Sequence, residues 1–157
     1  MSNCTWCHFS DADEEYRLYE GEYWIIFLAQ EQDYIGRCIL VLKRHCGTLS
    51  ALTENEWTDL FCMIQNVEAC LKEVFGADLC NWSCLMNSFF KDAVPDPHVH
   101  IHVRPRYSHP VLIGGNVYTD DAFGHHYTKT AVQRPCREDF GEIIHQMKTW
   151  FHTVPKK

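Results

Sequence analysis

Residues 98–104 read His-Val-His-Ile-His-Val-Arg, and this strict alternation decides how the neighbouring segments can be arranged. Successive side chains of a β-strand point to opposite faces, so the three histidines and Arg104 share one face and the three apolar residues share the other. The apolar face suits a protein core. Because each imidazole carries a polar donor and acceptor, the histidine face must meet water, a metal ion or a ligand.

Further strand candidates flank this stretch. Residues 16–29 are typical of a hairpin that turns at Glu20-Gly21-Glu22, residues 37–43 form a short apolar run after Gly36, and residues 79–87 alternate weakly. They are joined by one helical segment rather than by regularly alternating β-α units. This order predicts an α+β fold with an antiparallel sheet.

Two helices are predicted. Apolar residues recur at three- and four-residue steps over 53–75, where a Thr53–Glu56 capping box begins the segment and Gly76 ends it. The stripe comprises Leu49, Leu52, Trp57, Leu60, Phe61, Ile64, Val67, Leu71, Val74 and Phe75. A shorter amphipathic pattern over 138–151 predicts a C-terminal helix.

The length and composition fit one domain over residues 1–157. It would carry an N-terminal arm at residues 1–15 and a C-terminal extension at residues 105–157, irregular over 105–136. A formal charge of −7 argues against a general nucleic-acid surface, and no apolar run approaches a membrane span. With no visible signal peptide, the nine cysteines are expected to be reduced thiols in a cytoplasmic protein.

A second motif, Cys4-Thr-Trp-Cys7, is half of a tetrahedral zinc site. No second Cys-x-x-Cys exists in the sequence, so the remaining ligands should be histidines, and the candidates are His8, His45 and His98. For the histidine face itself two chemistries stay open. A central imidazole can attack phosphorus while its neighbours hold the oxygens, or the His-x-His spacing can bind a catalytic metal.

These motifs together resemble the histidine triad family of nucleotide hydrolases and transferases. His98-Val-His-Ile-His-Val is similar to the family's His-φ-His-φ-His-φ-φ signature, and the segment from Gly36 to His45 resembles its Gly-His-x-Leu-Val-Ile-Pro-Lys-x-His segment at the same spacing. Asn87 stands where the family has an amide near the phosphate. The Cys-x-x-Cys is typical of the zinc-bearing prokaryotic branch, and the resemblance covers about residues 4–107.

The resemblance implies a role for each matching residue. His100 would be the nucleophile that takes the nucleotidyl group, and His102 would hold the phosphate oxygens. A structural zinc ion would be bound by Cys4, Cys7, His45 and His98. The substrate-binding candidates are Asn87, Arg37 and Arg104. The implied activity is cleavage of a phosphoanhydride or phosphoramidate bond of a nucleotide, such as a dinucleoside polyphosphate, by a homodimer.

The sequence also departs from the family pattern. Pro95 replaces the hydroxyl residue that usually assists the leaving group, Arg37 replaces a histidine, and Ala29 falls where an acid commonly binds ribose, with Gln30 or Glu31 as substitutes. Substrate choice is therefore left open. Positive charge for a polyphosphate could come from four side chains, namely Arg37, Lys43, Arg104 and Arg106. Two alternatives remain, namely a metallohydrolase with its metal on the three histidines and a nucleotide-binding adaptor without turnover.

Overall fold

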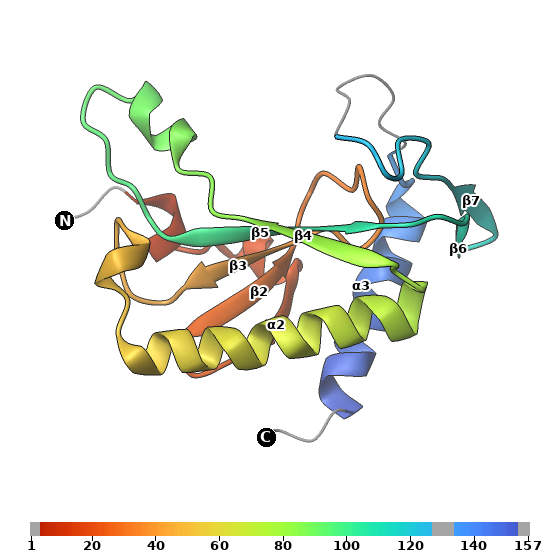
Figure 1. The fold of residues 1–157 in the computed structure, drawn as a ribbon, viewed down its shortest axis with the longest axis horizontal. Helices are drawn as coiled ribbons and strands as arrows, with labels where there is room; N and C mark the ends of the chain where they lie inside the picture. The colour runs from red at the N-terminus through yellow and green to blue at the C-terminus, as the bar shows by residue number, and fades with distance from the viewer. Residues whose placement is uncertain (1–3, 127–133, 154–157) are drawn as a thin grey trace.

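The computed structural model describes residues 4–126 and 134–153. Its centre is a five-stranded antiparallel sheet in the order β1-β2-β3-β5-β4 (Figure 1). The strands are Arg17–Glu20 (β1), Trp24–Leu28 (β2), Cys38–Leu42 (β3), Leu79–Ser83 (β4) and His100–Arg106 (β5). With the long helix α2 (Glu54–Phe75) and the C-terminal helix α3 (Arg137–Thr153), they form the α+β fold that the sequence predicts.

Helix α2 begins and ends as its sequence indicates. The Thr53 hydroxyl accepts from the Glu56 amide, the Glu56 carboxylate accepts from the Thr53 amide, and Gly76 ends the helix at a φ of 75°. The buried side is centred between Leu60 and Met63. Phe61 of the predicted stripe therefore falls on its flank and is 59% exposed. Among the described residues, no helix is long and apolar enough to cross a membrane.

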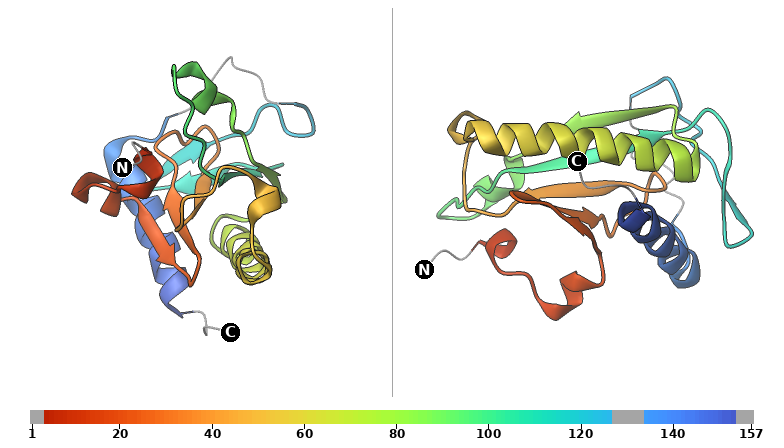
Figure 2. Two further views of the ribbon diagram at one scale, coloured as in Figure 1. Left: turned by 90° about the vertical axis from the view of Figure 1, so that its left-hand side faces the viewer. Right: turned by 90° about the horizontal axis from the view of Figure 1, so that it is seen from below.

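The sheet is covered on both faces. One face packs against α2 and α3 through a core that includes Ile26 and Leu40, and the other packs its Phe27 against Trp6 and Phe9 of the N-terminal arm. Figure 2 shows the arm and α2 on opposite sides of β2 and β3. The arm itself contains two short helices, η1 (Thr5–Cys7) and α1 (Asp11–Glu14). The histidine face of β5 lies on the side of the arm.

Strand boundaries differ from the sequence prediction around the histidines. β4 ends at Ser83, and a short helix η3 (Asn87–Lys91) follows it in a loop that projects from the sheet (Figure 1). β5 begins at His100, so His98 precedes the strand. The strand continues through Pro105, which pairs with Cys80.

Part of the segment predicted to be irregular is a hairpin. Its strands are Val111–Ile113 (β6) and Asn116–Tyr118 (β7). Gly114 and Gly115 form the turn with φ values of 56° and 90°, a conformation that glycine adopts without a steric cost. The buried carboxylate of Asp139, in the first turn of α3, accepts hydrogen bonds from Asn116 and Tyr118 and ties the hairpin to the helix.

Candidate functional site: a metal-ligand cluster beside a buried histidine

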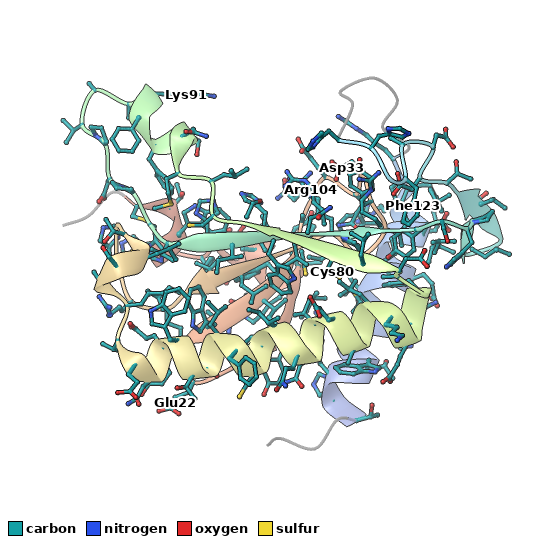
Figure 3. The ribbon with its side chains drawn as sticks, viewed as in Figure 1. Glu22, Asp33, Cys80, Lys91, Arg104 and Phe123 are labelled. Carbon is teal, nitrogen blue, oxygen red and sulfur yellow. The ribbon has the colours of Figure 1, made fainter. Side chains whose placement is uncertain are left out.

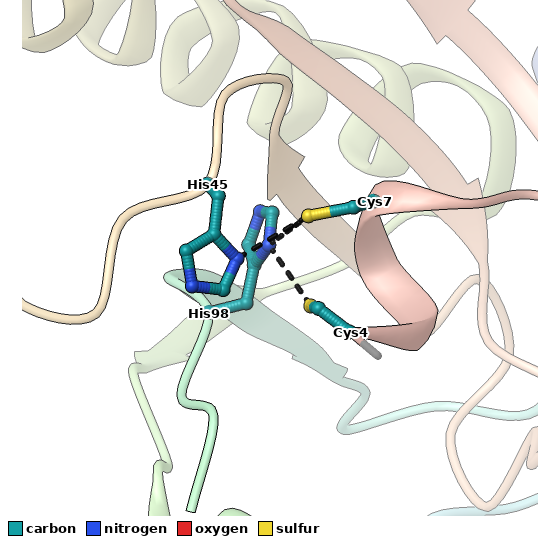
Figure 4. Close-up of side chains that lie close together, drawn as sticks. All are labelled: Cys4, Cys7, His45 and His98. Atoms are coloured by element: carbon teal, nitrogen blue, oxygen red, sulfur yellow. Dashed lines mark hydrogen bonds between the residues drawn. The ribbon is translucent and has the colours of Figure 1, made fainter. Parts of the chain in front are cut away.

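Four side chains from three parts of the chain meet at one end of the sheet (Figure 4). Sγ of Cys4 lies 3.3 Å from Nδ1 of His98, and Sγ of Cys7 lies 3.4 Å from the same nitrogen. Nδ1 of His45 is 3.2 Å from Sγ of Cys7. One ligand atom from each of the four residues can be chosen so that all lie within 4.8 Å of one another.

Both imidazoles of this cluster are oriented by their second nitrogen. Nε2 of His98 donates to the carbonyl oxygen of Leu42 at 2.7 Å, and Nε2 of His45 lies 3.0 Å from a carboxylate oxygen of Asp96. A carbonyl oxygen only accepts hydrogen bonds, so the proton of a neutral His98 sits on Nε2 and the lone pair of Nδ1 faces the sulfurs. Metal-bound histidines commonly have such oxygen partners.

The donor set fits zinc. In a tetrahedral site, Zn–S bonds of about 2.3 Å and Zn–N bonds of about 2.0–2.1 Å separate sulfur and nitrogen by about 3.6 Å. The separations of 3.2–3.4 Å are close to this value. His8, the other histidine that the sequence leaves open, is exposed and lines a cavity instead. Two of the three candidate histidines thus join the two cysteines.

His100 is buried next to this cluster, with 3% of its surface exposed. Its Nδ1 lies 2.8 Å from the carbonyl oxygen of His98 and must donate to it. In the neutral ring the lone pair is therefore on Nε2. Burial lowers the pKa of His100, with the hydrogen bond to His98 acting in the opposite direction. The neutral form, which can act as a nucleophile, is thereby favoured.

His102 is the next residue on the same face of β5, and its ring lies edge-on to that of His100 with centroids 4.9 Å apart. Burial, followed by the charges of neighbouring groups including Arg104 and Arg37, lowers its pKa to about 4. Nδ1 of His102 is buried and has no hydrogen-bond partner within the described residues. Such an orphan polar atom suits an anionic ligand, because a bound anion would supply the missing partner.

Two aromatic residues enclose His100. The indole of Trp6 stacks on its ring with centroids 5.2 Å apart and an interplanar angle of 16°. Phe89 of η3 contacts the ring edge-on at 5.6 Å. No sequence motif assigns either residue a role, although the position of Trp6 between two candidate metal ligands is a usable signal. The sequence motifs also assign no role to Asp96, whose carboxylate lies beside Nε2 of His45.

A cavity of about 670 Å³ has Trp6 as part of its lining. Its walls come from the N-terminal arm, from β2 and the segment after it, and from the beginning of β3. The lining includes Trp6, Phe9, Phe27, Ala29, Gln30, Glu31, Arg37 and Ile39. This volume and mixture of aromatic and polar walls are typical of a small-molecule site.

The arginines near the histidine face have different surroundings. Arg37 is buried and forms ion pairs with Asp33 at 2.9 Å and Glu31 at 3.2 Å, and its Nε is buried without a hydrogen-bond partner among the described atoms. Arg104 is half-buried, and Figure 3 shows it with Asp33 on the side of the sheet away from α2. Arg106, also a candidate for phosphate contact, is instead held by Asp120 in a buried pair at 2.5 Å.

Two further sequence candidates, Lys43 and Asn87, lie on other segments of the chain. Lys43 pairs with Glu20 at 2.7 Å at the far end of β1. Asn87 lies exposed at the beginning of η3, and Phe89 is the residue of that helix whose ring contacts His100. The loop after β4 thus brings the aromatic ring of Phe89 against His100.

Comparison with known proteins identifies the family. The model of the HIT domain matches residues 12–109. That span is more than half of the chain and contains His45 and all three triad histidines. The chain belongs to the HIT domain family. Cys4 and Cys7 precede the matched span, so the cysteine half of the metal cluster of this HIT protein lies outside the family match.

Solved structures share the fold of this HIT protein. A hypothetical histidine triad nucleotide-binding protein from Sulfolobus tokodaii superposes with a TM-score of 0.63 at 18% identity, covering 95% of this chain and 92% of that one. A zinc-bound histidine triad family protein from Mycobacterium smegmatis has a TM-score of 0.56 at 18% identity, covering 87% and 86%. A uridylyltransferase reaches 0.69 at 17% identity, covering 98% of this chain but 46% of that one. At these identities the likeness is one of fold.

One relative is more similar in sequence. The asymmetrical bis(5′-nucleosyl)-tetraphosphatase of Schizosaccharomyces pombe is 32% identical over 71 residues, which are 45% of this chain and 38% of that protein. The HIT protein thus matches well under two thirds of this relative's length.

Proposed function

We propose that this HIT protein is a nucleotide phosphohydrolase or nucleotidyl transferase that forms a covalent nucleotidyl intermediate on His100. The orientation of His100 carries the proposal, because its Nδ1 hydrogen bond to the His98 carbonyl directs the lone pair to Nε2. The relative from Schizosaccharomyces pombe, named as a dinucleoside tetraphosphatase, supports a nucleoside polyphosphate as the substrate.

In the first step, Nε2 of His100 attacks the α-phosphorus of the nucleotide. A P–N bond forms, and the bond from phosphorus to the bridging atom of the leaving group breaks with its electron pair. The leaving group takes its proton from solvent. His102 would donate a hydrogen bond to a phosphate oxygen, and the cationic side chains of Arg37 and Arg104 would lower the energy of the extra negative charge.

In the second step, water attacks the same phosphorus, the P–N bond breaks, and the proton that the water loses passes to solvent. The nucleoside monophosphate leaves and Nε2 of His100 regains its lone pair. In a transferase, the oxygen of an acceptor would replace that of water.

The nucleoside would occupy the cavity beside Trp6, where aromatic walls can stack on a base. Gln30 or Glu31 can reach the ribose there, in place of the acid that the family commonly has at the position of Ala29.

Trapping of the intermediate tests this proposal. The protein is mixed with an α-phosphate-labelled nucleoside polyphosphate, quenched and digested, and the label is located by mass spectrometry. We expect label on His100 in wild type and none in His100→Ala. His145→Ala, which changes an exposed histidine of α3, should label like wild type. An unlabelled wild type across purine and pyrimidine nucleotides, with binding retained, would favour the adaptor alternative.

We also propose that Cys4, Cys7, His45 and His98 hold a structural zinc ion. Four protein ligands complete a tetrahedral site and leave no position for a reacting water, so the ion would contribute folding stability. Metal analysis separates this from the metallohydrolase alternative. Cys4→Ser should lose one zinc per chain while His100→Ala keeps it. The reverse pattern would favour a metal on the triad.

We propose separately that the protein is a homodimer. The resemblance to the histidine triad family implies a homodimer, and sedimentation velocity measures this directly. A species of twice the chain mass of 18.4 kDa is expected at micromolar concentration. A single species at the chain mass would contradict it.

A further inference from the structure

Two of the contacts to the His100 ring come from a candidate metal ligand and from the sequence neighbour of another. Its Nδ1 donates to the backbone oxygen of His98, which is itself a candidate ligand. Its face is covered by Trp6, which lies directly before the candidate ligand Cys7. The metal cluster and the buried histidine thus form one connected unit.

We propose that Trp6 is a positioning residue that transmits metal binding to the orientation of His100. The indole holds the imidazole ring in the plane needed for attack, and the metal holds the indole. This inference rests on the proposed function for its catalytic consequence. The coupling between the metal and Trp6 does not depend on the reaction.

The stacking geometry is compatible with catalysis. The lone pair of Nε2 lies in the plane of the imidazole ring, so phosphorus must approach along the ring edge. Trp6 covers the face of His100, since the two rings are inclined by only 16°. It therefore restricts rotation of the imidazole about its side-chain bonds without occupying the direction of attack. A nucleophile misplaced by about 1 Å can lose about a hundredfold in rate.

The backbone explains why the metal would control Trp6. Residues 5–7 form the single turn η1, and the amide of Cys7 donates to the carbonyl of Cys4 at 3.1 Å. Trp6 is thus held in a loop whose two ends are both candidate metal ligands. Without metal, this turn retains two backbone hydrogen bonds, from Cys7 to Cys4 and from His8 to Thr5, and the packing of the arm, and the indole gains freedom to leave His100.

Single-turnover labelling of metal-loaded protein tests whether Trp6 positions His100. The rate of nucleotidyl transfer to His100 is measured as a function of nucleotide concentration in wild type, Trp6→Leu and Trp6→Phe. Trp57→Leu makes the same change at a half-exposed tryptophan on α2 and serves as the matched control. We expect the rate at saturating nucleotide to fall about 10- to 100-fold in Trp6→Leu, to recover in part in Trp6→Phe, and to be unchanged in Trp57→Leu.

The saturating rate separates positioning from substrate contact. Trp6 also lines the cavity, so its loss can raise the half-saturating concentration by weakening nucleotide binding. A higher half-saturating concentration of nucleotide, with an unchanged rate at saturation, would overturn the positioning role. If wild type does not label with any nucleotide, the proposed function fails together with the catalytic consequence, while the next measurement still decides the coupling to metal.

Indole emission tests whether metal binding holds Trp6 in place, and this test needs no reaction. The difference between the spectra of wild type and Trp6→Leu isolates the emission of Trp6 from that of the other four tryptophans. After metal removal by a chelator, with helical circular dichroism retained, we expect this difference spectrum to move to longer wavelength as the indole enters water, and added zinc should reverse the shift. An unchanged difference spectrum despite verified metal loss would overturn the coupling.

Discussion

The Asp96 carboxylate lies 3.0 Å from Nε2 of His45, and the other nitrogen of that ring lies 3.2 Å from Sγ of Cys7. A carboxylate that accepts from the distal nitrogen fixes the tautomer of a metal-binding imidazole and makes it a stronger ligand. Asp96 precedes His98 by two residues, so one short segment provides both a candidate ligand and the support for another.

Replacement of Asp96 by alanine should therefore lower zinc affinity about 10- to 100-fold. Competition with a chelating dye measures the affinity. Asp92→Ala removes an exposed carboxylate from the same loop and should bind zinc like wild type. Equal affinities for Asp96→Ala and wild type would show that this carboxylate does not support the site.

Acid should destabilise the protein in part through Glu56. Two hydrogen bonds from Arg44, at 2.6 and 2.8 Å, together with the capping contact at Thr53, lower the pKa of the Glu56 carboxyl to about 2. The folded-state pKa lies below the unfolded one, so this stabilisation is present above about pH 4.5 and is lost as the pH falls towards 2.

The test is Glu56→Gln, which keeps the capping box but removes the charge. Its free energy of unfolding should be lower than that of wild type at pH 7, and the difference should shrink between pH 5 and 2. Denaturant titrations at each pH measure it. Glu54→Gln, at an exposed position of the same helix turn, should follow the wild-type curve. A constant difference at all pH values would contradict the assignment.

His109 should stabilise the fold in the opposite pH range. Its ring nitrogens lie 3.0 Å from the carbonyl oxygen of Pro110 and 2.9 Å from that of Gly76, and these two acceptors raise its pKa. Only the protonated ring can donate to both carbonyls. The raised pKa means that the stabilisation is complete below about pH 6.5 and is lost as the pH rises through the folded-state pKa.

Melting temperatures between pH 6 and 9 test this expectation. The advantage of wild type over His109→Gln should be largest at pH 6 and decline at higher pH. His126→Gln changes an exposed histidine and should show the wild-type dependence. A pH-independent gap between His109→Gln and wild type would mean that the proton is not linked to folding.

A side chain at Gly36 should destabilise the fold more than one at Gly115. Its φ is 83°, and a Cβ there would lie 2.5 Å from Cδ2 of Leu71 in the core. Gly115 has a similar φ of 90° but open space around it. We expect Gly115→Ala to cost about 1–2 kcal/mol from backbone strain alone, and Gly36→Ala to cost about 1–3 kcal/mol more from overpacking. Equal losses in urea unfolding would contradict the close approach.

The strand and helix pattern was readable because it depends on neighbours in sequence. Alternation identified β5, and the capping box and Gly76 identified both ends of α2. The Gly114-Gly115 pair is an equally local turn signal, and it marks the β6–β7 hairpin within the segment predicted to be irregular. Phe61 shows the limit of such patterns, because only the angle at which α2 packs on the sheet decides which flank of an apolar stripe is buried.

The sequence by itself determined the α+β fold and the resemblance to the histidine triad family. Motif spacing indicated Cys4, Cys7 and three candidate histidines, and the resemblance reduced these histidines to His45 and His98. Tertiary structure decided that Arg106 is held by Asp120 and that Trp6 covers His100. The first pair is separated by 14 residues and the second joins the N-terminal arm to β5, and no local spacing predicts either pairing. The physical reason is that side chains of the same type look alike in a sequence pattern. Only the close packing of the folded chain decides which of them come into contact.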